Sequence, residues 1–432
     1  MKNADPYKEC LDKLFKLGRF GIKLELETIS NILKLLNSPQ NNFKTIHIAG
    51  TNGKGSIGTY ISSILLESGY KTALYTSPHL IRFNERFSIN GKDVSDDEIV
   101  NAYKAVNSSD IGKRKATFFE IATAMAFYMF SKNQVEFAVI ETGMGGRFDA
   151  TNIVTPEISI ISNLSIEHTD YLGHTIKALA KEKAGIIKYG KPVVTGVTQP
   201  SGIDYIRTKA QEQSSLVYVL KKEFSTRKNP KGNKFSYNGI FQKLINIETP
   251  LRGDHQRDNT ALALAALELL SNRYDNKIFT KSNVEKGLKK AKWPGRLDYV
   301  LDKPCVIIDG AHNKQASKVL SDYLKKNFKG RKLTSIIGIL DDKPYETMLK
   351  NLTSTSNRVI ITKAKIGRSI DPLILQKAAG KVSDAEIIII ADVGEACEYA
   401  INNSNDSDVI CIAGSLYVAG EAKEKIDNEF KA

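Results

Sequence analysis

The chain has 432 residues, of which 41% are hydrophobic and 25% charged, and its formal net charge at pH 7 is +14. This composition is ordinary for a folded protein and excludes an extended disordered chain, while the length predicts two or three domains. No apolar run approaches the roughly 20 residues that span a bilayer, and the N-terminal stretch lacks the apolar core of a secretory signal, so we expect a cytoplasmic protein with no membrane partner. The cysteines, Cys10, Cys305, Cys397 and Cys411, show no C-x-x-C spacing, which favours reduced thiols.

The basic charge indicates an anionic partner, either a nucleic acid or a small molecule. Lysine and arginine are dispersed, with runs only at KKEFSTRKNPKGNK and KGLKKAKWPGR, and no aromatic and basic signature of a nucleic-acid module is present. A basic cleft for a small anionic substrate explains the charge equally well. We therefore predict no nucleic-acid partner.

The first predicted strand is TIHIA at residues 45–49, and it leads through a glycine loop, HIAGTNGKGS at 47–56, into a stretch with helical spacing. Glycines let the backbone approach a ligand, and the unpaired N–H groups at a helix start favour an anion. Lys54 adds a positive charge and Ser56 a hydroxyl for a magnesium ion. The spacing is shorter than the common G-x-x-x-x-G-K-[ST] loop. A plain turn is the alternative, but it needs neither side chain, so we predict a polyphosphate site.

Apolar runs alternate with helical stretches from residue 43 to about residue 291, which predicts a parallel sheet covered by helices on both faces. A strongly apolar helix is expected at 117–130, a hairpin around the Asn-Gly pair in 234–248, and helices at 256–270 and just before WPGR. The predicted strands after the first are KTALYTS (71–77), EFAVIETG (136–143), ISIISN (158–163) and KPVVTGV (191–197).

The Pro-Gly pair of WPGR, at 293–296, marks the best domain boundary, because a second α/β series restarts after it. The first strand of that series ends in Asp309 and His312, at the sheet edge where ligands bind in open α/β folds. No G-x-G-x-x-G follows it, so a nicotinamide cofactor is not expected. The predicted strands are CVIIDG (305–310), LTSIIGIL (333–340), RVIIT (358–362), EIIII (386–390) and DVICIAG (408–414).

Other polar residues also follow predicted strands in the first series. Glu141 ends the third strand before a glycine-rich loop, which suits a magnesium ligand beside the phosphate loop, although a solvated strand-end glutamate has the same pattern. His168 follows the fourth strand, and Lys183 lies on a predicted helix. A lone histidine is often structural and a helix lysine often solvated, so the residues alone leave both open.

Taken together, these stretches resemble the folylpolyglutamate synthase and dihydrofolate synthase family, a branch of the Mur ligase superfamily of ATP-dependent amide-forming enzymes. The resemblance covers nearly the whole chain, and SPHL with RFNER separates the folate branch from the peptidoglycan branch. The motifs that carry it are HIAGTNGKGS, TSPHLIRFNERFSING, ETGMGGRFDATNIV, IEHTDYLG, KEKAGI, GDHQRDNTALA, WPGRLD, IDGAHN and GSLYVAGE.

The resemblance implies an α/β fold with two domains. Residues 1–296 would form an N-terminal phosphate-loop ATPase domain with a mostly parallel sheet and a folate-binding loop, and residues 297–432 a smaller, Rossmann-like glutamate ligase domain. ATP would phosphorylate a folate or dihydropteroate carboxylate, and the amino group of L-glutamate would attack the acyl phosphate. Relatives work as monomers, so a monomer is expected.

The resemblance also assigns site residues, motif by motif. Lys54, Lys183 and His312 would act in catalysis, with His312 near the incoming glutamate. Lys183 would be modified to a carbamate and become an oxygen ligand. ATP would be bound by Asn52, Gly53, Lys54, Gly55, Ser56, Asn259, Arg296 and Asp309, and Mg2+ by Ser77, Glu141, His168 and Lys183. The folate or pteroate would lie against Arg82, Thr117, Phe118, Phe119, Glu120, Phe148, Asp149 and Ala150.

Three alternatives remain open at this point. The chain could lengthen folate tails without joining glutamate to dihydropteroate, although the TFFE segment is compatible with a pteroate site. It could act on cell-wall nucleotide peptides, against which the SPHL and RFNER loop argues. It could also be a basic phosphate-loop protein that binds nucleic acid and hydrolyses ATP as a switch.

Overall fold

The computed structural model describes residues 5–17, 25–110, 114–167, 169–229 and 234–430. The chain forms two compact units. The first consists of Met1–His79, Phe83–Pro250 and Asp254–Lys292, and the second of Leu80–Arg82, Leu251–Gly253 and Trp293–Ala432. Among the described residues, no helix has both the length and the apolar character that crossing a membrane requires.

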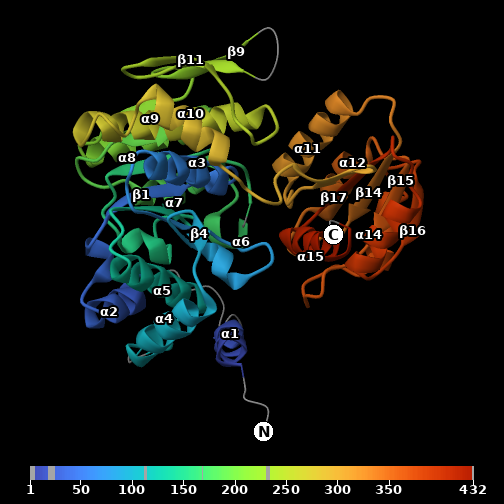
Figure 1. The fold of residues 1–432 in the computed structure, drawn as a ribbon, viewed down its shortest axis with the longest axis horizontal. Helices are drawn as coiled ribbons and strands as arrows, with labels where there is room; N and C mark the ends of the chain where they lie inside the picture. The colour runs from blue at the N-terminus through green and yellow to red at the C-terminus, as the bar shows by residue number, and fades with distance from the viewer. Residues whose placement is uncertain (1–4, 18–24, 111–113, 168, 230–233, 431–432) are drawn as a thin grey trace. The chain divides into compact units, whose positions relative to one another are not determined.

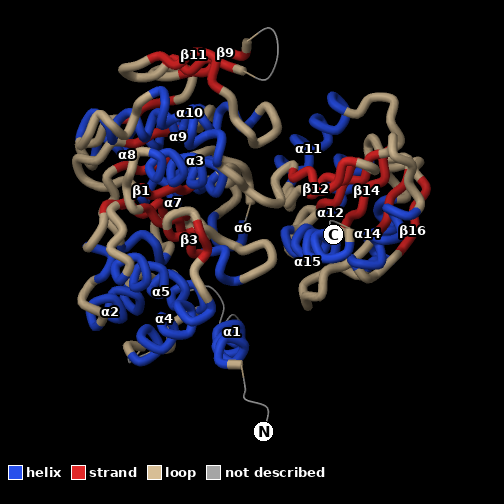
Figure 2. The backbone as a smooth tube through the Cα atoms, in the orientation of Figure 1, coloured by secondary structure: helices blue, strands red, loops and turns tan. Residues whose placement is uncertain are grey.

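The first unit is built on a sheet flanked by helices (Figures 1 and 2). The sheet has eight strands in the order β4-β3-β2-β5-β1-β6-β7-β8. All neighbours from β2 to β8 pair in parallel, whereas β3 and β4 are antiparallel at one edge. All five strands predicted for this sheet are confirmed. The bounds are β1 Lys44–Ala49, β2 Thr72–Tyr75, β3 Phe87–Ile89, β4 Lys92–Asp93, β5 Phe137–Glu141, β6 Ile158–Ile161, β7 Val193–Thr195 and β8 Val217–Val219.

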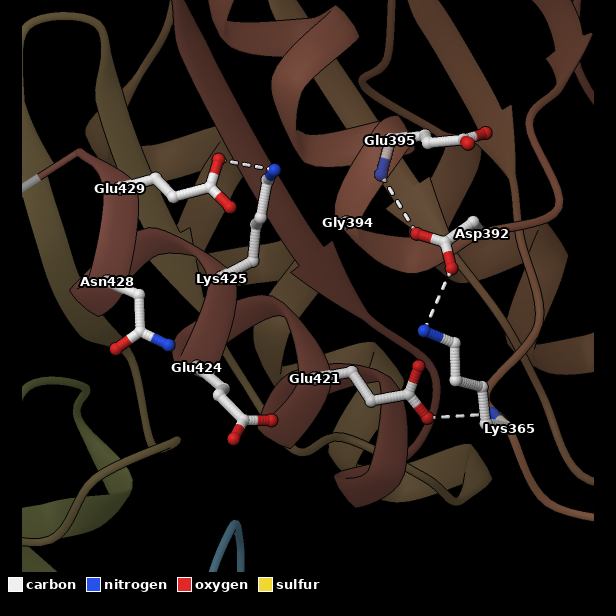
Figure 3. Close-up of a pocket in the computed structure, with 9 residues that line it drawn as sticks. All are labelled: Lys365, Asp392, Gly394, Glu395, Glu421, Glu424, Lys425, Asn428 and Glu429. Atoms are coloured by element: carbon white, nitrogen blue, oxygen red, sulfur yellow. Dashed lines mark hydrogen bonds and ion pairs between the residues drawn. The ribbon is translucent and has the colours of Figure 1, made fainter.

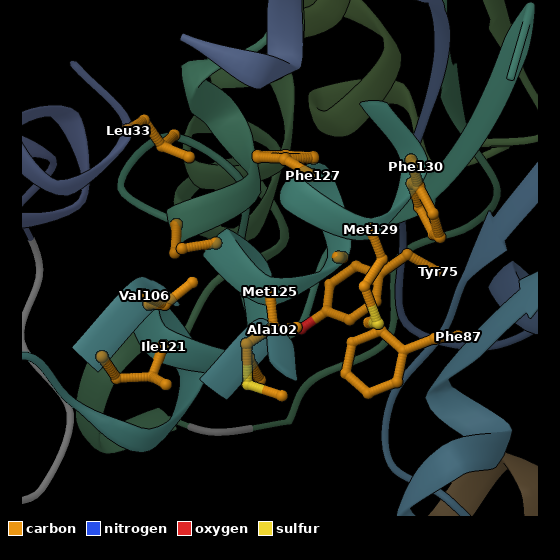
Figure 4. Packing of buried hydrophobic residues seen from close by; sticks show 14 of the residues in the cluster. Leu33, Tyr75, Phe87, Ala102, Val106, Ile121, Met125, Phe127, Met129 and Phe130 are labelled. Carbon is orange, nitrogen blue, oxygen red and sulfur yellow. The ribbon is translucent and has the colours of Figure 1, made fainter. Parts of the chain in front are cut away.

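Helices cover both faces of this sheet, as predicted, because successive strand side chains point to opposite faces. On one face α5 packs its aromatic and methionine side chains against alternate residues of β2 and β5, with Phe127 and Phe130 fully buried (Figure 4). On the other face α3 lies against the sheet, where a Cβ on Gly58 would meet Leu74 and Val139. The helices are α1 Pro6–Leu17, α2 Glu27–Leu35, α3 Lys54–Glu67, α4 Asp96–Ser108, α5 Phe118–Lys132, α6 Thr169–Leu172, α7 Ile176–Lys183, α8 Pro200–Glu212, α9 His255–Arg273 and α10 Lys281–Lys290.

The predicted hairpin is present as β10 (Phe235–Asn238) and β11 (Lys243–Ile247). A third strand, β9 (Ser225–Lys228), pairs antiparallel with β10 and completes a small separate sheet. The carboxylate of Glu268 on α9 accepts hydrogen bonds from the backbone N–H groups of Ile240 and Phe241, both at 2.8 Å. These contacts hold the hairpin turn against α9.

The second unit has a six-stranded sheet in the order β12-β13-β17-β14-β15-β16, parallel except for the β12–β13 pair. One apolar cluster lies beneath α11, α12 and α13 and another beneath α14 and α15, so both faces are covered. All five predicted strands of this series are confirmed. The bounds are β12 Asp298–Asp302, β13 Cys305–Ile308, β14 Leu333–Ile337, β15 Arg358–Ile361, β16 Glu386–Ile389, β17 Val409–Ala413, α11 Lys314–Asn327, α12 Tyr345–Thr353, α13 Pro372–Ala379, α14 Val393–Asn402 and α15 Leu416–Glu429.

Candidate active site

The glycine loop between β1 and α3 has the tight geometry that its sequence predicts. Gly50 has a φ of 147° and Gly53 a φ of 86°, values that side-chain-bearing residues rarely adopt. A Cβ at Gly53 would lie 2.5 Å from Oδ1 of Asn259, and a Cβ at Gly50 would lie 1.8 Å from Oγ of Ser162. Both positions therefore require glycine, because backbone conformation and neighbouring side chains exclude anything larger.

The segment after β6 fixes the conformation of this loop. Asn163 pairs with Asn52 in both directions, since Asn52 N–H donates to Oδ1 of Asn163 at 3.1 Å and Nδ2 of Asn163 donates to the Asn52 carbonyl at 2.9 Å. Thr51 Oγ1 donates to the Ser165 carbonyl at 3.1 Å. These bonds within the chain itself hold the backbone of the loop in one conformation.

Lys54 folds back over the loop and faces the end of β5. Its Nζ donates to the carbonyls of Gly50 and Thr51 at 3.1 and 3.2 Å and lies 3.7 Å from Oε1 of Glu141. The register explains this contact, because β1 and β5 are neighbours and Ile48 pairs with Glu141. The strand-end carboxylate is buried against the phosphate-loop lysine, so it is not the solvated glutamate that the sequence also allowed.

The first turn of α9 lies against the start of α3. Nε2 of Gln256 is 3.3 Å from Oγ of Ser56, and Nδ2 of Asn259 donates to Oε1 of Gln256 at 3.0 Å. All three side chains are buried. The structure therefore brings the predicted ATP-binding residues Ser56 and Asn259 together, through a glutamine that the sequence analysis missed.

Lys183 lies at the C-terminal end of α7 and is only 1% exposed, so it is not a solvated surface lysine. Its Nζ is 3.6 Å from Oε1 of Glu167. Burial, together with the charge of Lys54 and opposed by Glu167 and Asp149, lowers the pKa of Lys183 to about 8. An amine with this pKa is partly neutral at physiological pH and can act as a nucleophile.

The glycine-rich loop after β5 packs onto the same end of α7. The backbone N–H of Arg147 donates to the Glu182 carbonyl at 2.7 Å, and a Cβ on Gly146 would lie 3.0 Å from the Lys183 carbonyl. Phe148 is half-buried, and the Arg147 guanidinium carbon lies 4.3 Å from the centroid of the Phe148 ring. The predicted folate-binding residues Phe148, Asp149 and Ala150 thus lie on a loop that also seats the helix end of Lys183.

Thr117 and Glu120, both predicted at the pterin site, bind each other. They form a capping box at the start of α5: the N–H of Thr117 donates to Oε2 of Glu120 at 2.8 Å, and Thr117 Oγ1 accepts from the Glu120 N–H at 3.3 Å. Arg114 holds the same carboxylate with two further bonds of 3.0 and 2.8 Å. The T-x-x-E spacing is a known capping signature, so the sequence alone indicates that these two residues cap the helix.

Phe118 and Phe119, which lie between Thr117 and Glu120, contact different neighbours. A Cβ on Gly143 would lie 2.5 Å from the ring of Phe119, so this ring touches the loop after β5. Phe118 stacks on Phe15 of α1, with centroids 5.8 Å apart, and the Arg86 guanidinium lies 5.2 Å from the Phe118 centroid. The start of α5 is therefore aromatic, partly exposed and flanked by a cation.

In the second unit, Asp309 and His312 follow β13. Oδ2 of Asp309 accepts from the Leu297 N–H at 2.8 Å and Oδ1 accepts from the Ala311 N–H at 2.9 Å. Burial raises the pKa of Asp309, while the Arg296 guanidinium opposes that shift. Nδ1 of His312 donates to the Gly310 carbonyl at 2.8 Å when the ring is neutral, so Nε2 is then the acceptor nitrogen.

The second unit also has an open pocket of about 480 Å³ beside the start of α14 (Figure 3). Several of its charged groups are paired: Lys365 Nζ lies 3.0 Å from Asp392, Lys425 pairs with Glu429, and the Glu395 N–H donates to Asp392 at 3.0 Å. We assign no ligand to it. The lining residues are Lys365, Asp392, Gly394, Glu395, Glu421, Glu424, Lys425, Asn428 and Glu429.

The chain matches known protein families and their members over most of its length. The model of the Mur ligase middle domain matches residues 48–267, and that of the Mur ligase, glutamate ligase domain, matches residues 295–416. The dihydrofolate synthase/folylpolyglutamate synthase of Bacillus subtilis is 35% identical over 419 residues, covering 94% of this chain and 96% of its own. The chain belongs to the Mur ligase family, in its folylpolyglutamate and dihydrofolate synthase branch.

Solved structures of this branch share the whole fold. E. coli FolC in complex with DHPP and ADP has a TM-score of 0.89 and 28% identity, with 98% of each chain covered. The bifunctional folylpolyglutamate synthase/dihydrofolate synthase of Yersinia pestis, complexed with AMPPNP and Mn ion, has a TM-score of 0.87 and 26% identity, with 98% of each covered. The predicted fold class is confirmed.

The remaining predicted residues of this Mur ligase fall in three places. Ser77 follows β2 at the sheet edge that holds Glu141, since Tyr75 pairs with Ile140. Arg82 is exposed and belongs to the second unit. His168 lies outside the described residues, among which no group of three or more His, Cys, Asp and Glu side chains could hold a metal. Ser77 and Glu141 nevertheless offer the oxygen ligands that magnesium prefers.

Proposed function

We propose that this ligase uses ATP to phosphorylate a carboxylate of a folate, and also of dihydropteroate, and joins it to the amino group of L-glutamate, with ADP and phosphate as the other products. The observation that carries the proposal is the buried contact between Lys54 of the phosphate loop and Glu141, in a chain that matches this branch over nearly its full length. A carboxylate does not react with an amine at neutral pH, so prior phosphorylation makes chemical sense of an ATP site in an amide-forming enzyme.

The transfer requires two anions to meet, which calls for positive charge and alignment more than for acid–base catalysis. Lys54 supplies a fixed charge above the phosphate loop, and the N–H groups at the start of α3 supply a second source of anion stabilisation. Asn52, Gly53, Gly55, Ser56 and Asn259 would hold the nucleotide with it.

Magnesium would be held by Ser77, Glu141 and His168, and when bound it neutralises charge shared between the phosphate groups. The two described residues of this set fit, because they offer a hydroxyl and a carboxylate at one sheet edge. The Mn ion and AMPPNP in the Yersinia pestis relative support a divalent metal with ATP here.

Lys183 would carry a carbamate and act as a further oxygen ligand. Its amine adds to carbon dioxide in the neutral form, with loss of one proton, and burial makes that form accessible near pH 8. The modification would also replace the repulsion between the Lys183 and Lys54 cations with an attraction.

The acceptor substrate would lie against the start of α5 and the loop after β5. The aromatic rings of Phe118, Phe119 and Phe148 suit a flat pterin, and Thr117, Glu120, Asp149 and Ala150 would shape the wall around it, with Arg82 approaching the folate. In the second unit, Arg296 and Asp309 would complete the nucleotide site, and His312 would stand near the incoming glutamate. The expected monomer remains a prediction.

The test measures phosphate released from ATP by the purified protein with magnesium, L-glutamate and either dihydropteroate or tetrahydrofolate, each component being omitted in turn. Glutamate-dependent release with dihydropteroate in one reaction and with tetrahydrofolate in another supports the two activities. Release with tetrahydrofolate alone restricts the enzyme to tail elongation. Release indifferent to glutamate and pterin refutes the ligase.

A further inference from the structure

The central strand β1 buries a histidine that the proposed chemistry does not use. His47 is 0% exposed, and its Nε2 lies 2.8 Å from Oγ1 of Thr151, a residue 104 positions further along the chain. Its Nδ1 is buried and has no hydrogen-bond partner among the described residues. An unsatisfied buried nitrogen is costly, and an apolar side chain would fill the same space without that cost.

The hydrogen bonds around Thr151 have a defined direction. The Thr151 hydroxyl donates its single proton to Oδ1 of Asp149, so it accepts at the other side, and Nε2 of His47 must carry the proton and donate. The neutral Nε2–H tautomer is therefore the one present. His47, Thr151 and Asp149 form a directed chain that ends on a carboxylate.

Asp149 in turn shapes the loop after β5. Its Oδ2 accepts from the Met144 N–H at 2.8 Å, and its Oδ1 accepts from the Thr151 N–H at 3.1 Å, so one carboxylate ties both ends of the loop together. The side chain is buried and caps the short helical turn that follows it. The conformation of residues 143–152 thus depends on where this carboxylate points.

This loop also contacts the catalytic end of α7. Nδ2 of Asn152 donates to the carbonyls of Arg147 and Gly185 at 2.9 and 3.1 Å, and a Cβ on Gly185 would lie 2.4 Å from Cα of Arg147. Three residues beyond His47, the same strand β1 enters the phosphate loop at Gly50. The directed chain therefore connects the nucleotide strand to the loop proposed for the pterin.

We propose that His47 is a positioning residue of the ligase: through Thr151 it fixes Asp149, and with it the loop 143–152 that holds the pterin substrate in line with the phosphate loop. The inference rests on the proposed function. A histidine that only filled the core would affect stability, whereas a positioning histidine sets the Michaelis constant for the pterin separately from that for ATP.

The test compares Thr151→Val, which keeps the shape but removes the hydroxyl, with Thr151→Ser, which keeps the hydroxyl. The matched control is Ser159→Ala, because Ser159 pairs in register with His47 on the neighbouring strand and its buried hydroxyl donates only to the Ile186 carbonyl, at 2.8 Å. Steady-state glutamate-dependent phosphate release gives kcat and the KM values for the pterin and for ATP.

We expect Thr151→Val to raise the pterin KM by about tenfold or more, the effect of losing one hydrogen bond to a charged group, with the KM for ATP changed by less than about twofold. His47→Leu, measured beside it, should raise the pterin KM in the same selective way, and a pterin KM unchanged in His47→Leu would remove the histidine from this role. Thr151→Ser and Ser159→Ala should keep both KM values near those of the wild type. If Thr151→Val does not fold, as judged by circular dichroism, His47→Leu and His47→Gln replace the pair, because glutamine retains an N–H donor.

Equal pterin KM values for Thr151→Val and the wild type overturn the inference, as does an equal rise in Ser159→Ala, which would reduce the effect to general destabilisation. Failure of the proposed function looks different. In that case the wild-type protein itself shows no release that depends on glutamate and pterin.

Discussion

The same buried histidine makes the stability of the first unit depend on pH. Burial, together with the charge of Lys188, lowers the pKa of His47 from its usual 6.5 to about 3. The unfolded chain therefore binds a proton at pH values between 6.5 and 3 that the folded chain does not bind. Because the unfolded state holds more protons in this window, stability is complete above pH 6.5 and falls as the pH decreases towards 3.

The size of the effect follows from the shift. A pH of 5 is 1.5 units below the pKa of His47 in the unfolded chain, 6.5, and well above its pKa in the folded chain. One unit corresponds to about 1.36 kcal/mol, so His47 lowers the free energy of unfolding by about 2 kcal/mol between pH 7.5 and pH 5. His47→Gln removes the titrating group but keeps an N–H donor, so the variant should lose about 2 kcal/mol less than the wild type over this range.

Urea unfolding at the two pH values, followed by far-UV circular dichroism, measures this difference. The single tryptophan, Trp293, lies in the second unit, and its fluorescence reports that unit separately. His174→Gln is the matched control, because it removes one histidine at an exposed position of the first unit. An identical pH-dependent loss in His47→Gln and in the wild type would refute the assignment of a neutral buried imidazole.

Three further outcomes are expected. Lys54→Ala should lower kcat/KM by about 10²- to 10³-fold in steady-state assays, since it removes the fixed charge at the phosphate loop, and Lys54→Arg should restore little because the Gly50 and Thr51 carbonyls suit a compact ammonium. Lys183→Ala should be nearly inactive and partly restored by added short carboxylic acids if a carbamate is present, and full activity of the unsupplemented variant would contradict the modification. Glu120→Ala should lower the free energy of unfolding by about 3 kcal/mol, because it removes both the helix cap and the partner of Arg114. Glu120→Gln should lower it by about half as much. Chemical denaturation measures both variants, and equal losses would show that the charge of Glu120 is unimportant.

The sequence was most informative where local composition decides the structure. The strands β1, β5 and β6 are buried on both faces, so each is a mostly apolar run, rich in β-branched residues, that can be recognised without knowing its neighbours. The edge strand β4 and its neighbour β3 have two and three residues, and β9 is largely exposed, so pairing partners rather than composition define them. These strands were missed for that reason.

The same distinction applies to the site. Lys54 and Glu141 could be placed together because both follow neighbouring parallel strands, whose carboxyl ends share one sheet edge. The partner of Lys183, the contact of Gln256 with Ser56 and the chain from His47 to Asp149 join residues from different elements by side chains alone. No periodicity encodes such contacts, because they depend on how the elements pack.

The charges in the first unit explain why such an enzyme should depend on a divalent metal. Lys54 lies 3.7 Å from Glu141, and Lys183 lies 3.6 Å from Glu167 and within the electrostatic influence of Asp149, so two cations face three carboxylates before any substrate arrives. The surplus is negative, although ATP and the proposed carboxylate substrate are both anions, and a carbamate on Lys183 would make it more negative. The overall charge of +14 attracts anions at long range but does not reverse this local balance. A doubly charged ion beside Glu141 would reverse the local balance. This is the position at which the phosphate loop and the strand-end carboxylate converge.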